Sequence, residues 1–315
     1  MVNKNTIFIC IASFNEEDLV QTIQSCLNNS DYPENVFFGI AAQYPDKEVP
    51  EFSNYPNVRY VIVPGSTPLG TSPTRAIAAS LRKHEQFFLS IDAHMLFKKH
   101  WDSTLIEHYE LLSLICKKPV ITTYVPFWYK REDNTPINQI GSPDMSLDMP
   151  IHSLRFKNKS DEKPGLFELP TPTWDDELTT PYKEHYLASA HFLFSKSTLL
   201  EEVPFDTSLT YYEENTLAMR LWTRGYRLFA INKDTMWSRE MYSGKDVENS
   251  WRQNAFRKDS TGNTHMENIV NGTLRCKEIL LGNILGVFGA PTKELLLEYE
   301  KCAGISYAEI FGAQE

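Results

Sequence analysis

The stretch FFLSIDAHMLFKKHWD, Phe87–Asp102, begins as an apolar run and continues into an Asp-x-His pair. The run predicts a strand that is buried on both faces, as in a parallel sheet. Asp92 and His94 follow the carboxyl end of this strand, where open parallel sheets bind their ligands. An oxygen and a nitrogen ligand two residues apart can reach one divalent cation such as Mn²⁺. The pair alone fits a capped turn equally well, with Asp92 bonded to backbone amides and His94 packed.

The segments before this strand predict an α/β fold with a Rossmann-like, mostly parallel sheet flanked by helices. Helical spacing appears at residues 14–30, with Asn15 as the predicted N-cap, and again at residues 74–84. The order strand–helix–strand–strand–helix–strand is that of an α/β protein. Four apolar runs are typical of buried strands and span residues 6–13, 35–43, 58–64 and 86–94.

A long polar segment follows this first part of the chain. Residues 130–182 are rich in Pro, Asp and Asn and show little periodicity, which predicts a loop. Loops of this length are usually functional. Residues 213–231 predict a helix, a C-cap at Gly225 and a strand, and helical patterns dominate after residue 246.

The composition predicts a soluble, cytoplasmic protein. The chain of 315 residues has a formal net charge of −10, which argues against sequence-independent binding to phosphate backbones. No apolar stretch approaches the roughly 20 residues of a membrane span, and no signal peptide is expected at the start. The scattered cysteines form no CxxC pair and predict reduced thiols; they are Cys10, Cys26, Cys116, Cys276 and Cys302.

Two further motifs place charged residues where a ligand could bind. Arg75 ends the segment GTSPTR, residues 70–75, and could contact a phosphate through two parallel hydrogen bonds. Glu213 and Glu214 follow two tyrosines and open a predicted helix. Each motif has a plain alternative. A single arginine is commonly a solvated surface residue, and carboxylates in a first helical turn favour the helix dipole without any other role.

Taken in order, the motifs IASFNEE, SPTR, IDAHM and YYEEN…RLWTRGY resemble one family. They are similar to those of GT-A-fold glycosyltransferases related to the cytoplasmic hydroxyproline-modifying polypeptide α-GlcNAc-transferases, and more distantly to the mucin-type polypeptide GalNAc-transferases. The resemblance covers roughly residues 6–242. It implies a GT-A catalytic domain over residues 1–245, with a nucleotide-sugar half over about 1–100 and an acceptor half over about 101–245. We expect the loop 130–182 to help set acceptor choice, and residues 246–315 to form a helical extension.

The resemblance also implies roles for individual residues. Asp92 and His94 would hold Mn²⁺ (or Mg²⁺) against the diphosphate of a UDP-sugar, where a cation stabilises charge on the departing UDP. Glu213, Glu214 and Asp92 would form the catalytic group of a reaction that retains anomeric configuration without a strong protein nucleophile. The donor-binding residues would be Ala12, Phe14, Asn15, Glu17, Arg75, Asp92 and Ala93. The acceptor-side residues would be Trp101, Asp102, Tyr212 and Trp222.

The chain departs from the family pattern at a second metal-binding histidine. In the segment DTMWSREMYSG, Ser238 occupies the position where relatives usually carry it. His265 could replace it as a ligand, although an ordinary loop histidine is the simpler interpretation. His191, in ASAHFLF, is expected on a buried strand as a core or pocket-lining ring rather than a ligand.

These expectations lead to one main function and two alternatives. The main hypothesis is a metal-dependent retaining glycosyltransferase that moves a sugar, GlcNAc first, from a UDP-sugar to a hydroxyl of a protein or glycan. The first alternative is a phage-type transferase that acts on hydroxymethylated bases in DNA. Two local basic segments support this alternative, and the negative net charge argues against it. The second is a UDP-sugar-binding module without turnover, which the serine at position 238 motivates. No membrane partner is expected.

Overall fold

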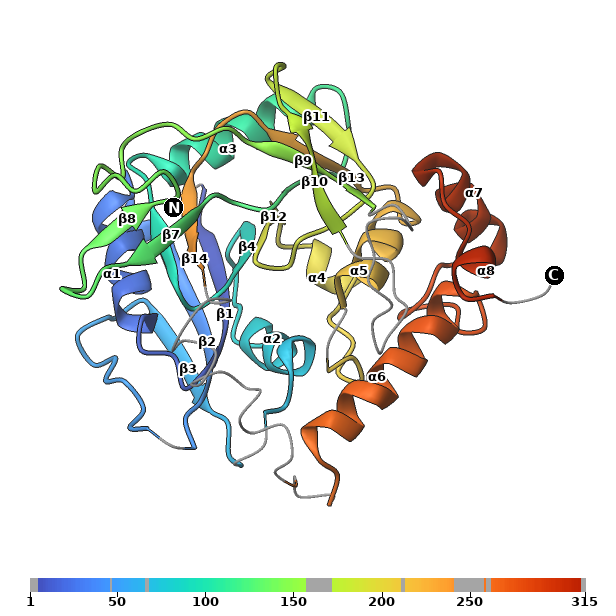
Figure 1. Cartoon of the computed structure of the whole chain (residues 1–315), viewed down its shortest axis with the longest axis horizontal. Helices are drawn as coiled ribbons and strands as arrows, with labels where there is room; N and C mark the ends of the chain where they lie inside the picture. Colours follow the sequence, from blue (N-terminus) through green and yellow to red (C-terminus); the bar gives the residue numbers. More distant parts are fainter. Residues whose placement is uncertain are drawn as a thin grey trace.

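Eight strands form the central sheet of the computed structural model, which describes residues 5–45, 47–65, 68–156, 172–210, 213–240, 258 and 262–312 (Figure 1). Their order across the sheet is β11 (Tyr182–His185), β13 (Arg227–Ile231), β6 (Pro119–Thr122), β12 (Phe192–Lys196), β4 (Phe87–Ile91), β1 (Ile7–Phe14), β2 (Val36–Gln43) and β3 (Val58–Ile62). Strands β4, β1, β2 and β3 run parallel to one another, so their carboxyl ends meet at one edge of the sheet. Strand β12 is antiparallel to β4 and to β6.

The predicted order of elements in the first hundred residues is confirmed. Helix α1 (Leu19–Asn29) follows β1, a short 3₁₀ turn (Pro33–Asn35) precedes β2, and helix α2 (Thr71–Ala79) precedes β4. The prediction that Asn15 caps α1 is wrong, because the helix begins four residues later and Asp18 lies at its N-terminal boundary. Asn15 instead has a left-handed backbone, with φ of 52°.

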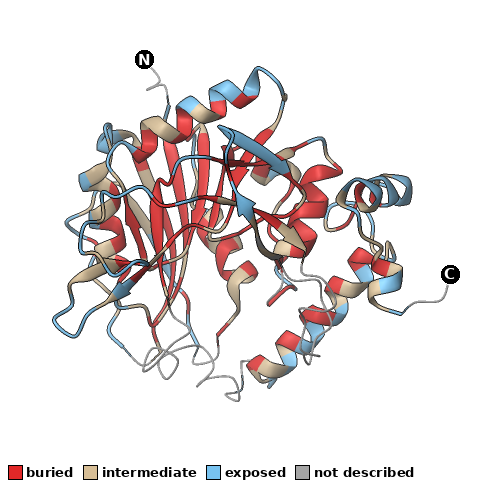
Figure 2. Ribbon diagram, turned by 45° about the horizontal axis from the view of Figure 1, so that its top comes forward, coloured by how far each residue is buried: buried red, intermediate tan, exposed pale blue. Residues whose placement is uncertain are grey.

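Two hydrophobic layers cover the two faces of the sheet, and α1 and α2 lie on opposite sides of β1 (Figure 1). Because side chains alternate along a strand, Ile7 and Ile9 of β1 pack with α1 and α3 (Trp101–Ser113), whereas Phe8 and Cys10 pack with α2. Figure 2 shows the central strands as buried. Burial on both faces explains why β1 and β4 are almost continuously apolar.

The C-terminal helices complete the second of these layers. Helices α5 (Glu213–Trp222), α6 (His265–Leu280), α7 (Lys293–Ala303) and α8 (Tyr307–Ile310), with the short α4 (Leu199–Glu202), lie on the α2 side of the sheet (Figure 1). Helices α6, α7 and α8, which belong to the expected helical extension, therefore share a hydrophobic layer with β1 and β4. The members that they contribute to this layer include Cys276, Ile279, Leu296, Tyr299 and Tyr307.

The segment 130–182 is not a structureless loop where it is described. It contains β8 (Pro136–Asn138), β9 (His152–Phe156) and β10 (Pro172–Glu177), and β9 and β10 pair with each other. Strand β8 is the edge of a second sheet, in the order β5 (Met95–Phe97), β14 (Met236–Arg239), β7 (Phe127–Lys130) and β8. These strands have only three to six residues each, which is too few to leave a clear periodic pattern in the sequence.

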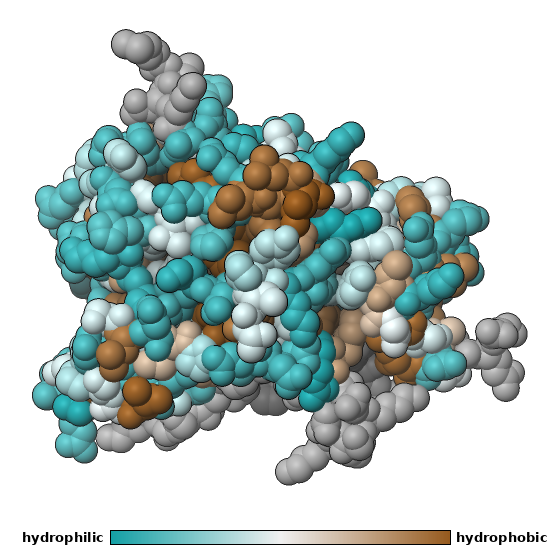
Figure 3. All heavy atoms as spheres, turned by 90° about the horizontal axis from the view of Figure 1, so that it is seen from above, coloured by the Kyte–Doolittle hydropathy of each residue, from teal (hydrophilic) through white to brown (hydrophobic). Residues whose placement is uncertain are grey.

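The surface is mainly hydrophilic on the face that Figure 3 shows, and its most extensive hydrophobic patch lies near the centre of this view. The last turn of α3 and the residues after it expose large apolar side chains at Leu111, Leu114 and Ile115. Among the described residues, no helix has the length and apolar character needed to cross a bilayer.

Candidate active site

The Asp-x-His pair lies at the carboxyl edge of the parallel strands, as predicted. Asp92 directly follows β4, and His94 directly precedes β5. Asp92 Oδ2 and His94 Nε2 lie 3.8 Å apart. The other atoms of the two side chains face protein partners, because Asp92 Oδ1 accepts a hydrogen bond from Arg75 Nη2 at 2.7 Å and His94 Nδ1 lies 3.2 Å from Glu16 Oε1. The free faces of the two side chains therefore point toward one another.

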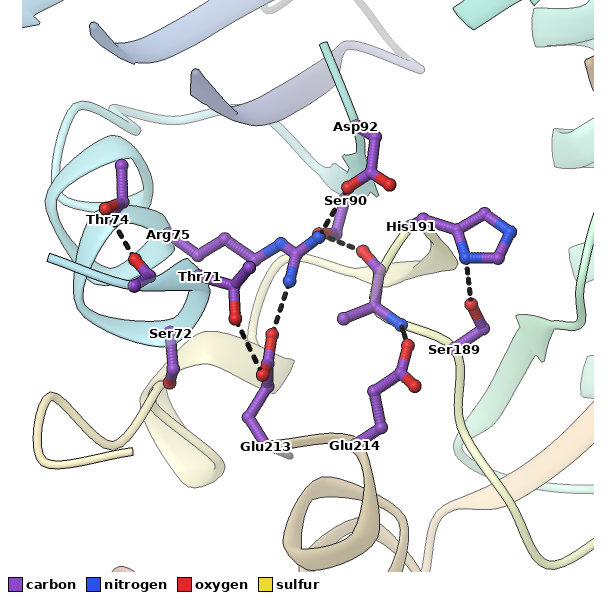
Figure 4. A network of polar contacts seen from close by, with 12 residues as sticks. Thr71, Ser72, Thr74, Arg75, Ser90, Asp92, Ser189, His191, Glu213 and Glu214 are labelled. Carbon is purple, nitrogen blue, oxygen red and sulfur yellow. Dashed lines mark hydrogen bonds and ion pairs between the residues drawn. The ribbon is translucent and has the colours of Figure 1, made fainter. Parts of the chain in front are cut away.

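Arg75 joins the Asp-x-His segment to the two glutamates (Figure 4). Its side chain is only 4% exposed, and its Nη1 donates to Glu213 Oε1 while Nη2 donates to Asp92. Burial alone would lower the pKa of Arg75, but Glu213 and Asp92 outweigh it and raise this pKa. The same guanidinium lowers the pKa of Asp92 against the opposing effect of burial. The alternative of a solvated surface arginine is therefore wrong.

The segment before α5 docks on the first turn of α2 and so brings Glu213 to Arg75. Gly70 has φ of 98°, and a Cβ there would lie 2.4 Å from the carbonyl oxygen of Thr210, so only glycine fits this approach. The Thr71 amide donates to that same carbonyl at 3.1 Å, and the Thr71 hydroxyl donates to Glu213 Oε2 at 2.8 Å. The motifs SPTR and EEN, far apart in the chain, thus form one unit.

Glu214 faces the turn that precedes β12. Its Oε1 accepts a hydrogen bond from the Ala190 amide at 2.7 Å, and the Ala190 carbonyl accepts one from Ser90 of β4 at 2.7 Å (Figure 4). Burial, and then the charge of Glu213, raise the pKa of Glu214 to about 7. The two glutamates therefore have specific partners in the site, which a favourable interaction with the helix dipole alone does not explain.

His191 lines the same region from the turn in front of β12, one residue before the strand on which it was predicted. Its Nδ1 lies 2.7 Å from the Ser189 hydroxyl, and its ring stacks on Tyr124 with centroids 5.3 Å apart. Burial lowers the pKa of His191 to about 4, against the opposing effect of Asp92, so the ring is neutral near pH 7.

The model of the family described as glycosyltransferase (GlcNAc) matches residues 6–56 and 51–280. The chain belongs to this glycosyltransferase family. The resemblance inferred from the motifs is thus confirmed, and the match extends through α6. No curated protein matches the chain.

Solved structures show which fold this glycosyltransferase has. A crystal structure of GalNAc-T7 with UDP, GalNAc and Mn²⁺ superposes with a TM-score of 0.56 at 12% identity and covers 97% of this chain. S. aureus TarS (residues 1–349) and its complex with UDP-GlcNAc give TM-scores of 0.44 and 0.43 at 12% and 11% identity, over 74% and 77% of the chain. The chain spans only 56% of GalNAc-T7 and 60% of the TarS fragment. The likeness to GalNAc-T7 establishes the expected GT-A fold.

The metal-ligand atoms at the strand ends fit the cation that the family resemblance implies. Asp92 offers one oxygen and His94 one nitrogen across 3.8 Å, a combination that suits Mn²⁺. Burial opposes a charged His94, but Glu16 and then Asp92 raise the pKa of this imidazole to about 9, so the site strongly favours positive charge. Within the described ranges, no group of three or more His, Cys, Asp and Glu side chains could hold a metal ion. Among the residues that the structure describes, Asp92 and His94 are therefore the pair best placed to hold a cation.

The two candidates for an additional ligand lie in different surroundings. Ser238 pairs with Met95 across β14 and β5, and is therefore beside the Asp-x-His segment. His265 is the first residue of α6 and not a loop residue. It is 2% exposed, and its Nδ1 lies 2.8 Å from the Pro68 carbonyl oxygen. Since His265 joins no metal-binding group among the described residues, its predicted role as a ligand is not supported.

Three residues predicted on the acceptor side instead pack within the fold. Trp101 is fully buried, and its Nε1 donates to the Cys26 carbonyl at 3.0 Å. Asp102 accepts hydrogen bonds from the Ser30 hydroxyl and from two backbone amides, and so ties α3 to the end of α1. Trp222 packs edge to face on Tyr299 within the second hydrophobic layer. The predictions for Trp101, Asp102 and Trp222 are corrected accordingly, and Tyr212 lies outside the described residues.

The predicted donor-binding residues lie along one edge of the sheet, but Glu16 rather than Glu17 reaches the Asp-x-His pair. Ala12 and Phe14 belong to the end of β1, and Ala93 lies between Asp92 and His94, where its carbonyl accepts from the Thr22 hydroxyl. Glu17, however, is 54% exposed and lies 3.6 Å from Arg239. Its neighbour Glu16 is the residue that reaches His94. Spacing could not distinguish two adjacent glutamates in a turn, so sequence reasoning missed Glu16.

The raised pKa of Glu214 leads to a prediction about stability. A glutamate whose pKa is about 7 in the folded state, rather than the ordinary 4.5, contributes stability at pH values below its pKa in the unfolded chain. This contribution is lost as the pH rises through about 7. In Glu214→Gln the side chain is neutral at every pH, so its contribution to stability does not change over this range. The free energy of unfolding of Glu214→Gln minus that of the unmodified protein should therefore increase between about pH 4 and about pH 8. Urea unfolding across this range measures it, and a difference independent of pH would contradict the assignment.

Proposed function

We propose that this glycosyltransferase moves a sugar, GlcNAc first, from a UDP-sugar to an acceptor hydroxyl on a protein or glycan, with retention of configuration. The observation that supports it best is the unit formed by Asp92, Arg75 and Glu213 at the carboxyl edge of the sheet. It combines a two-residue cation site with a buried guanidinium and the adjacent Glu214. The description of GalNAc-T7 with UDP, GalNAc and Mn²⁺, a protein of the same fold, supports a nucleotide-sugar donor.

Each group has a distinct task in this proposal. A cation held by Asp92 and His94 would supply charge stabilisation to the diphosphate of the leaving UDP. Arg75 keeps Asp92 ionised and in place, since its Nη2 holds Oδ1 and leaves Oδ2 facing His94. Glu214 is fixed by the Ala190 amide beside this group, where it can orient a hydroxyl of the sugar or acceptor. No strong protein nucleophile is part of this proposal. The acceptor hydroxyl would attack the sugar on the same face from which the UDP departs, and would pass its proton to the departing phosphate.

A screen of sugar nucleotides tests the proposal. The protein is heated with Mn²⁺ and UDP-GlcNAc, UDP-GalNAc or UDP-glucose, with GDP-mannose as the control, and release of UDP is followed in parallel. A donor at about 100 times its Kd should add ~2.7 kcal/mol to the stability of the folded state and raise its melting temperature. Melting temperatures that respond to no UDP-sugar would refute a donor site. Binding without any UDP release, with or without protein and glycan acceptors, would favour a binding module instead.

A further inference from the structure

The imidazole of His94 lies between two carboxylates, and each faces a different ring nitrogen. Glu16 Oε1 lies 3.2 Å from Nδ1, and Asp92 Oδ2 lies 3.8 Å from Nε2. The side chains of His94 and Glu16 are only 14% and 17% exposed, so water screens this contact weakly. Glu16 and Asp92 face different ring nitrogens, and among the described residues Glu16, Asp92 and His94 do not form a group that could hold one metal ion together. The contact of Glu16 with Nδ1 must act through the ring.

The turn after β1 aims Glu16 at this ring. Asn15 has φ of 52°, a conformation that costs about 1 kcal/mol or more for a residue other than glycine and persists only where its surroundings impose it. Its amide donates to the Gln43 carbonyl at 3.0 Å. The Tyr44 hydroxyl, which is nearly buried, lies 2.8 Å from Ser13 Oγ and donates to the Glu16 carbonyl at 2.7 Å. The turn is thus fixed on both sides of Asn15, so the backbone that carries Glu16 is held in place.

The backbone of His94 is fixed independently of its ring. Its carbonyl accepts hydrogen bonds from Trp128 Nε1 and from the Arg239 amide, each at 3.1 Å. The next amide, that of Met95, donates to the Thr22 hydroxyl at 2.8 Å. What remains free is rotation of the imidazole and the choice of its tautomer. Glu16 is the residue placed to decide both.

We propose that Glu16 is a positioning residue that accepts the Nδ1 proton of His94 and so presents the unprotonated Nε2 to the cation beside Asp92. The inference rests on the proposed function and goes beyond it, because it assigns the cation affinity partly to a residue that does not bind the cation. A carboxylate bonded to the second nitrogen of a metal-binding histidine fixes the tautomer, holds the ring and makes it a stronger ligand.

Mn²⁺ affinity, measured by electron paramagnetic resonance on the full chain with UDP present, tests the inference without relying on turnover. Glu16→Gln should weaken Mn²⁺ binding by about 10- to 100-fold. Glu201→Gln removes the same charge from α4, where the side chain is 64% exposed, and should change the affinity by less than about threefold. Asp92→Asn, which removes a proposed ligand, should abolish measurable binding.

A double-mutant cycle separates positioning from a general effect of charge or of folding. In a His94→Ala background, Glu16→Gln should cause no further loss of Mn²⁺ affinity, because its effect passes through the imidazole. An equal loss in both backgrounds would overturn the inference, and so would an unchanged affinity of Glu16→Gln in the unmodified background while Asp92→Asn still fails to bind. If Asp92→Asn itself retains Mn²⁺ affinity, the cation site of the proposed function fails instead. The two failures are therefore distinguishable.

Discussion

Asp92→Asn is expected to lower UDP-sugar turnover by about 10²- to 10³-fold, the range seen when one electrostatic contact to developing charge is removed. The amide keeps the size of the side chain but loses the charge that attracts a cation and that pairs with Arg75 at 2.7 Å. The loss should appear mainly in kcat, because charge on the departing UDP develops in the transition state. UDP release at saturating donor, with Mn²⁺ at the concentration that saturates the unmodified protein, measures it.

Asp148→Asn is the matched control for this change. Asp148 pairs with Lys98 at 2.9 Å, but it is 81% exposed. Pairs of this kind contribute about 0–1 kcal/mol to stability, so the control should fold normally and keep its turnover. Turnover by Asp92→Asn within about tenfold of the unmodified protein would show that this carboxylate is not at the reacting diphosphate.

Arg75→Met is expected to lower the free energy of unfolding by about 3–5 kcal/mol, as when one member of a buried ion pair is removed. Methionine replaces much of the volume but leaves Asp92 and the nearly buried Glu213 without their shared cation. Glu214 would then face two uncompensated carboxylates. Urea unfolding near neutral pH measures the loss. Adding Glu213→Gln should restore part of it, because one of the stranded charges is removed.

Arg82→Met serves as the control, since it removes the same charge just beyond the end of α2. Arg82 donates to Glu201 at 2.8 Å, and Glu201 is 64% exposed. An ion pair this exposed is worth about 0–1 kcal/mol. Losses of equal size in Arg75→Met and Arg82→Met would mean that Arg75 does not hold the two distant carboxylates together.

The parts of the fold that the sequence predicted well are those in which burial leaves a local pattern. Strands β1 and β4 are covered on both faces, so their residues are apolar in succession, and α1 and α2 show helical spacing. From the strand assignment alone, Asp92 and His94 could be placed at the carboxyl edge. Arg75 and the two glutamates could be named as candidates, but their contact with one another could not be predicted from spacing.

The errors concern residues whose surroundings come from distant segments. Trp101 and Asp102 follow the Asp-x-His motif closely in the chain, yet the start of α3 turns them toward α1. The strands in segment 130–182 have only three to six residues each, and β9 and β10 pair across a polar stretch, so no periodicity revealed them.

By itself the sequence determined that this protein is an α/β glycosyltransferase with an Asp-x-His pair at a strand end, because strand burial, helical spacing and motif order are written in neighbouring residues. The tertiary structure alone decided which charged groups meet. It joined Arg75 to Asp92 and Glu213, and it turned Glu16 rather than Glu17 toward His94. The physical reason is that an ion pair forms only when two side chains lie within a few ångströms of each other. The backbone turns at Asn15 and Gly70 set this separation, and the spacing of residues along the sequence does not.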